Sequence, residues 1–162
     1  MNQKTPSHFT APELRVAHWI DGEGQPRAPL TLAELGTEYK VLYCFQHWCP
    51  GCHSTGFPTL KKLIAALSAK RFGFAVVQTV FEGEEVNTPE RLRETQLRYD
   101  LHVPFGHDAA VDGYPTVMRD YRTGGTPWFI VISPTGEVMY GGFRLDAEDF
   151  IASIEQAHAP TN

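Results

Sequence analysis

The sequence contains few cysteines, and this scarcity excludes a scaffold held together by disulfides. Only three are present in 162 residues, and all three lie between positions 44 and 52. Cysteines so closely spaced cannot brace distant parts of a chain. Their clustering therefore points to chemistry rather than to structural cross-linking.

Long apolar runs and an excess of basic residues are also missing. No stretch approaches ~20 consecutive apolar residues, so we expect no membrane-spanning helix. The formal net charge is −5, with only 14 lysines and arginines, which argues against a nucleic-acid-binding surface. The N-terminal residues lack the apolar core of a secretory signal. The sequence as written thus favours a cytoplasmic protein, or a periplasmic or other extracytoplasmic one if a signal was removed.

The chain has the length of one domain with a substantial hydrophobic core. It shows no internal repeat, low-complexity tract or linker. We expect a flexible N-terminal lead over residues 1–12, a single domain over residues 13–158, and a C-terminal tail over residues 159–162, with fraying from His158 onward.

Hydrophobic periodicity predicts strands that alternate with helices. Strands are expected at residues 14–20, 41–45, 72–80 and 128–132, and at 138–143 as the returning half of a hairpin. Helical segments are expected at residues 31–35, 57–67, 88–99 and 115–121, and after a capping Asp146. Alternation in the first half implies parallel strands, and the hairpin adds antiparallel ones. The prediction is an α/β fold with a mixed central sheet flanked by helices.

The chemistry lies in the segment Trp48-Cys49-Pro50-Gly51-Cys52-His53, which follows the strand expected at 41–45 and opens a helix. A thiol attacks a disulfide as its thiolate, and an ordinary cysteine is mostly protonated at neutral pH. At a helix start, unpaired backbone N–H groups and the helix dipole favour negative charge on Cys49. Cys52 lies one turn further on, so its sulfur can reach Cys49 and resolve a mixed disulfide.

The residues around the pair have predicted roles of their own. Pro50 suits an early helical position because it has no N–H to leave unpaired. Gly51 leaves open backbone for a partner protein. Trp48 belongs to the docking surface around Cys49, to the core, or to both. His53 either stabilises a thiolate or accepts a proton, or it faces solvent from the helix.

Here the chain resembles the thioredoxin superfamily, specifically its TlpA/ResA-like thiol–disulfide oxidoreductases. The resemblance covers the order of elements over about residues 11–157 and two sharp motifs, Trp48 to Cys52 and Gly125-Thr126-Pro127. It implies a thioredoxin-like fold and a cis Thr126–Pro127 bond in a loop that faces the cysteines. The free backbone of that loop would pair with an extended substrate segment.

The resemblance also implies an activity, namely exchange of a Cys49–Cys52 dithiol or disulfide with protein thiols or disulfides. The partners would be a protein substrate and a second redox protein. No metal or organic cofactor is needed. The direction of exchange depends on the reduction potential of the pair. No prediction is made of the oligomeric state.

Three positions depart from the family pattern. Pro58 comes nine residues after Cys49, one residue later than in the family, which predicts a one-residue shift in the first helix. Tyr43 stands where thioredoxins have an aspartate. Thr55 stands where the TlpA/ResA branch has a glutamate, so the usual acceptors of the Cys52 proton are missing.

Other functions could use the same segment. A peroxiredoxin-type thiol peroxidase would share the fold and use Cys49 against peroxides, although Gln46 replaces that family's usual threonine. A zinc site would use the cysteine pair with His47 and His53 nearby, but no second Cys-x-x-Cys is present. The Cys-x-x-Cys-His string also matches c-type haem attachment, although the strong strands oppose a helical haem protein.

The remaining cysteine, Cys44, lies on the apolar strand expected at 41–45. Cysteine packs as a small hydrophobic residue, so we expect an inert buried thiol. A third redox role is the alternative.

Overall fold

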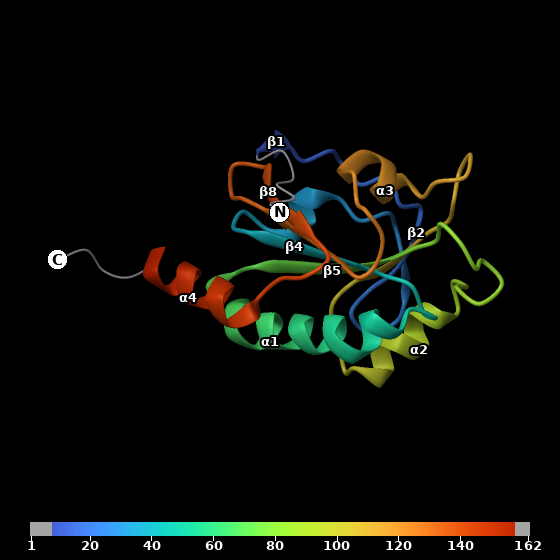
Figure 1. Ribbon diagram of the computed structural model, residues 1–162, viewed down its shortest axis with the longest axis horizontal. Coiled ribbons are helices and arrows are strands. Elements are labelled where there is room, and N and C mark those ends of the chain that lie inside the picture. The colour runs from blue at the N-terminus through green and yellow to red at the C-terminus, as the bar shows by residue number, and fades with distance from the viewer. Residues whose placement is uncertain (1–7, 158–162) are drawn as a thin grey trace.

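The computed structural model describes residues 8–157, which form an eight-stranded sheet with helices on both faces (Figure 1). The strands are β1 (Phe9–Thr10), β2 (His18–Ile20), β3 (Pro26–Arg27), β4 (Lys40–Phe45), β5 (Gly73–Thr79), β6 (Phe105–Asp108), β7 (Trp128–Ile132) and β8 (Glu137–Gly142). The helical segments are η1 (Leu32–Leu35), η2 (Cys52–Gly56), α1 (Phe57–Leu67), η3 (Ser68–Lys70), α2 (Arg91–Arg98), α3 (Thr116–Tyr121) and α4 (Ala147–Ala157).

The sheet is mixed, as the order of elements predicts. Its strand order is β1-β8-β7-β4-β5-β6-β2-β3. β4, β5 and β6 run parallel, whereas β7 pairs antiparallel with β4 and forms a hairpin with β8. Helices α1, α2 and α4 cover one face, and α3 covers the other (Figure 1).

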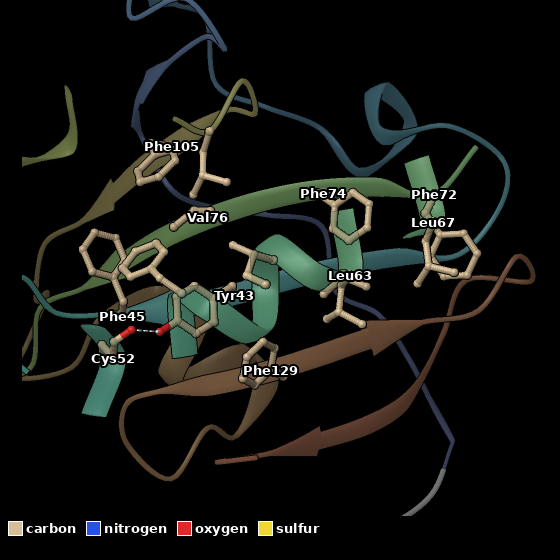
Figure 2. Close-up of a cluster of buried hydrophobic side chains, with 14 of the residues drawn as sticks. Tyr43, Phe45, Cys52, Leu63, Leu67, Phe72, Phe74, Val76, Phe105 and Phe129 are labelled. Atoms are coloured by element: carbon tan, nitrogen blue, oxygen red, sulfur yellow. Dashed lines mark hydrogen bonds between the residues drawn. The ribbon is translucent and has the colours of Figure 1, made fainter. Parts of the chain in front are cut away.

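Strand β4 lies inside the sheet, and all six of its residues are buried. Because side chains alternate along a strand, Tyr43 and Phe45 join the core beneath α1, whereas Leu42 and Cys44 join the core on the opposite face. The apolar run that predicts a buried central strand is therefore confirmed. Figure 2 shows the aromatic side of this core, where Tyr43 lies close to Cys52.

The first long helix begins with a widened turn. Helical backbone starts at Pro50, and residues Cys52–Gly56 form the π turn η2 before α1 continues. A π turn is closed by an i to i+5 hydrogen bond, one residue longer than an α turn. That extra residue is what the position of Pro58 predicts, so the expected shift in the helix is confirmed.

The structure contains a strand that periodicity does not predict. β6 pairs with β5 and β2, although Phe105 is its one large apolar residue. A Cβ on Gly106 would lie 2.9 Å from the ring of Trp19, so this strand depends on close packing with its neighbour. The expected strand at 14–20 is shorter, since only His18–Ile20 pairs. The expected helix at 88–99 is also shorter, spanning Arg91–Arg98.

Strand β1 also falls outside the prediction. Phe9 and Thr10 pair with β8, so they belong to the sheet rather than to a flexible lead. Two residues are too few to show a period of two. Residues 1–7 of the expected lead and the expected C-terminal tail lie outside the described residues. Among the described helices, none has both the length and the apolar content needed to cross a bilayer.

Candidate active site

The paired cysteines lie just beyond the end of β4 and differ in exposure. Cys49 is partly exposed, whereas Cys52 is fully buried. The backbone N–H of Cys52 donates a hydrogen bond to Cys49 Sγ over 3.3 Å. A partner approaching from solvent therefore meets Cys49 first, with Cys52 behind it.

The surroundings of Cys52 keep it protonated. Burial raises the pKa of Cys52 to about 12, and its hydrogen bond with Cys49 acts in the same direction. Hydrogen bonding from the Gln46 backbone and the Thr126 side chain acts on this pKa in the opposite direction. The polar groups around Cys52 therefore favour its thiolate, but the effect of burial is larger and keeps the pKa high.

A loop from the other half of the chain lies against the cysteines. Its Thr126–Pro127 peptide bond is cis. A Cβ on Gly51 would lie 3.6 Å from Pro127 Cδ, and the Gln46 side chain donates to Thr126 Oγ1 over 3.4 Å. The cis bond and the position of this loop both match the sequence prediction.

An open groove of about 240 Å³ runs beside Cys49. Its walls come from the cysteine turn, the segment after β5, the Thr126 loop and the end of β8: Gln46, Trp48, Cys49, Pro50, Phe81, Glu82, Gly125, Thr126 and Phe143. Trp48 is 47% exposed and Phe143 is 49% exposed. Large apolar side chains thus stand open to solvent on the groove, and Trp48 lies at the surface rather than in the core.

Comparisons with known proteins agree with this geometry. No family model matches the sequence, and no curated protein sequence does. The crystal structure of a thioredoxin-like superfamily protein superposes with a TM-score of 0.79 at 30% identity, over 91% of this chain and 94% of that one. The chain belongs to the thioredoxin-like superfamily.

Two other thioredoxin-like structures are similar over nearly their whole length. A thiol-disulfide isomerase from Corynebacterium glutamicum matches at 25% identity with a TM-score of 0.75, over 93% of this chain and 98% of that one. The thioredoxin domain of a thiol-disulfide oxidoreductase from Bacteroides vulgatus matches at 19% identity with a TM-score of 0.68, over 95% and 99%. At 19% identity, the similarity to the Bacteroides vulgatus domain is a similarity of fold alone.

His53 follows the cysteine pair. Both of its ring nitrogens hydrogen-bond to groups other than the cysteine sulfurs. Nε2 lies 2.6 Å from the carbonyl oxygen of His47, so it donates, and Nδ1 lies 2.6 Å from the hydroxyl of Tyr99. Burial lowers the pKa of His53. A neutral ring with these two partners ties the cysteine turn to the end of α2 in this thioredoxin-like fold.

Two buried amides that sequence reasoning missed connect the loops of the site. Asn87 accepts the N–H of Trp48 over 3.3 Å and donates to the carbonyls of Glu82 and Gly83 over 3.1 and 3.0 Å. It also donates to Gln46 over 3.4 Å. No motif marks Asn87, because its partners Gln46 and Trp48 lie about forty positions earlier.

The sequence also makes predictions about the remaining cysteine and the possible metal ligands. Cys44 is completely buried, as expected, and burial raises its pKa. Within residues 8–157, no three His, Cys, Asp or Glu side chains gather closely enough to hold a metal ion.

Proposed function

We propose that this thioredoxin-like protein is a TlpA/ResA-like thiol–disulfide oxidoreductase whose redox-active pair is Cys49 and Cys52. One observation carries the proposal: a partly exposed sulfur in a groove accepts a backbone N–H and has a buried thiol directly behind it. An attacking thiol must be accessible, and a resolving thiol must be within reach but shielded.

The exchange follows from this order. The Cys49 thiolate attacks one sulfur of a substrate disulfide, and the other substrate sulfur leaves as a thiolate that takes up a proton. Cys52 then loses its proton to water and attacks Cys49 Sγ. The Cys49–Cys52 bond forms, the mixed disulfide breaks, and the second substrate sulfur leaves. Two electrons pass to the substrate, and a second redox protein restores the dithiol; the reverse sequence oxidises a substrate dithiol.

The groove supplies a means to hold the substrate. Thr126 and Pro127 stand across from the cysteine turn, and we assign to their loop the backbone that pairs with an extended substrate segment. Trp48 and Pro50 form the opposite wall. Gly51 keeps the approach to the sulfur free of a side chain.

The names of the structural relatives support this proposal at the level of reaction class. The relative from Corynebacterium glutamicum is a thiol-disulfide isomerase, and the domain from Bacteroides vulgatus comes from a thiol-disulfide oxidoreductase. Protein thiols and disulfides are accordingly the substrates we assign to this chain, with no metal or organic cofactor required for the exchange.

Single replacements of the two cysteines test the proposal. We expect Cys49→Ser to abolish exchange with a disulfide-bonded protein substrate. Cys52→Ser should stop the reaction at the mixed disulfide, because the resolving sulfur is gone, and mass spectrometry should place the adduct on Cys49.

Two outcomes would contradict this scheme. An adduct on Cys52 in place of Cys49 would reverse the assigned roles. Rapid peroxide turnover through a Cys49 sulfenic acid, without any disulfide exchange, would identify a thiol peroxidase instead.

A further inference from the structure

A tyrosine hydroxyl is buried directly beneath the resolving cysteine. Tyr43 lies on β4 with no exposed surface, and its hydroxyl donates to the carbonyl oxygen of Cys52 over 2.9 Å (Figure 2). The same carbonyl accepts the N–H of Phe57, the bond that closes the π turn. One donor from the sheet and one from the helix therefore hold the backbone of Cys52.

The hydroxyl fits there because residue 56 has no side chain. A Cβ on Gly56 would lie 1.9 Å from Tyr43 Oη and 2.8 Å from Cζ. Neither separation is possible between non-bonded atoms, so any larger residue at position 56 must displace the hydroxyl or the turn. Tyr43, Gly56 and the widened turn thus form one fitted unit under Cys52.

We propose that Tyr43 is a positioning residue for the resolving step: its hydroxyl, seated in the space that Gly56 leaves, ties the Cys52 backbone to the central strand and holds Cys52 Sγ behind Cys49. This inference rests on the proposed exchange and adds to it the group that orients the second thiol. Tyr43 is a hydrogen-bond donor here and not a proton acceptor.

The surroundings of Tyr43 support the donor role. Burial, and then the adjacent Cys52 and Cys49 sulfurs, raise the pKa of Tyr43 well above its usual value. The hydroxyl therefore keeps its proton and remains a donor for the Cys52 carbonyl.

The resolving step is sensitive to such a bond because it is intramolecular. Its rate depends on how often Cys52 Sγ occupies the position from which it can attack Cys49. Loss of one buried hydrogen bond weakens the state it supports by a factor of roughly 3 to 10. The first attack, by Cys49 on the substrate, does not use Cys52 Sγ and is independent of this bond.

The test compares Tyr43→Phe with Tyr121→Phe. Tyr121 is a matched control, because it is also buried and its hydroxyl also donates to a backbone carbonyl, that of Pro12, but in the core on the other face of the sheet. Rapid mixing with a disulfide-bonded substrate separates formation of the mixed disulfide from release of the second product. Equilibration with glutathione gives the reduction potential, and urea unfolding verifies that each variant is folded.

We expect Tyr43→Phe to release the second product roughly 3- to 10-fold more slowly, with formation of the mixed disulfide unchanged. Its Cys49–Cys52 disulfide should be less favoured by the same factor, which makes the potential up to about 30 mV less negative. Tyr121→Phe should lose stability without a change in the rate of product release or in the reduction potential.

If the two folded variants release product at the same rate, the positioning role of Tyr43 is wrong, while the proposed exchange itself stands. Failure of the unmodified protein to exchange would instead refute the proposed function.

A second variant, on the helical side, disturbs the same contact between the Tyr43 hydroxyl and the Cys52 carbonyl. Gly56→Ala should displace the Tyr43 hydroxyl and reproduce the slow release, so it carries the test even if Tyr43→Phe does not fold. Because both changes remove one contact, the double variant should release product no more slowly than the slower single variant. Effects that multiply would show that Tyr43 and Gly56 act separately and would overturn the proposal.

Discussion

Three thiols lie between positions 44 and 52, and they differ in burial and surroundings. Cys49 is partly exposed and accepts a backbone N–H, whereas Cys52 is buried behind it. Cys44 is buried among apolar side chains on the opposite face of the sheet. The three thiols therefore lie in three different surroundings, and on this basis we propose Cys49 as the attacking thiol, Cys52 as the resolving thiol and Cys44 as an inert one.

The inert thiol gives a first prediction. We expect Cys44→Ser to exchange disulfides at the normal rate and to lose about 1–3 kcal/mol of unfolding free energy, because the serine hydroxyl is buried among apolar neighbours. Urea unfolding and a disulfide-exchange assay measure the two effects. Cys44→Ala serves as the control, since it adds no polar group. Collapse of turnover in a folded variant would show that Cys44 takes part in the reaction.

The raised pKa of Cys52 gives a second prediction, on the pH dependence of release. The pKa lies at about 12 because the thiol is buried, so the thiolate fraction grows tenfold with each pH unit below that value. Release of product from the mixed disulfide should therefore accelerate with pH from neutrality upward without a plateau near pH 7. Stopped-flow kinetics over this range measure it.

His53 offers the control for that profile. Both of its ring nitrogens have other partners, so His53→Ala should keep the same dependence on pH. A plateau near neutrality that disappears in His53→Ala would show that the imidazole accepts the Cys52 proton after all.

At the scale of elements, the groove combines side chains from segments that are distant in sequence. Trp48 follows β4, Phe81 follows β5, and Phe143 follows β8. Phe143 packs edge-on against Trp128, with ring centroids 4.8 Å apart. That contact holds an exposed aromatic side chain in place next to the Thr126 loop, where a partner would touch it.

This arrangement predicts different effects on large and small substrates. Phe143→Ala should lower kcat/KM for a protein disulfide by roughly 5- to 30-fold, the usual effect of removing an aromatic contact from an interface. Turnover of a small disulfide that does not reach Phe143 should be unchanged. Leu97→Ala is the control, because Leu97 is also exposed, at 61%, and lies on α2. Equal losses for both substrates would indicate a structural defect rather than a lost contact.

The elements also show what sequence could and could not predict. Sequence predicts the apolar strands β4 and β7 and the apolar face of α1, because buried residues repeat with the period of the element. β6 gives no such pattern, since its position depends on Gly106 fitting against Trp19. The cysteine pair and the cis-proline loop are found from local motifs. Asn87 is not, because its hydrogen bonds join segments about forty positions apart. The Tyr43 contact spans only nine positions, but it depends on the π turn and on the space beside Gly56, which no local motif marks.

At the scale of the whole molecule, the buried thiols and phenols couple folding to alkaline pH. Burial raises the pKa values of Cys52, Cys44, Tyr43 and Tyr121. A group with a raised folded-state pKa binds its proton more tightly in the folded protein than in the unfolded chain. Its stabilisation is complete below the unfolded pKa and is lost as the pH rises through the folded one.

From neutral pH to about pH 8 the reduced protein should therefore keep its unfolding free energy, and above that it should lose it progressively, starting near the unfolded thiol pKa of ~8.5. Urea unfolding at several pH values under reducing conditions measures the decline. Cys52→Ala should start from a lower stability but decline less steeply, because it lacks one of these groups. Identical slopes for the two proteins would contradict the raised pKa of Cys52.

The ends of the sheet have a consequence for how the protein behaves at high concentration. Its two outermost strands, β1 and β3, are each two residues long. β3 begins with Pro26, which has no N–H to offer a neighbour. Short edges give another copy of the chain little backbone on which to nucleate a continuous sheet. The short edges thereby protect the protein from polymerising through its own sheet.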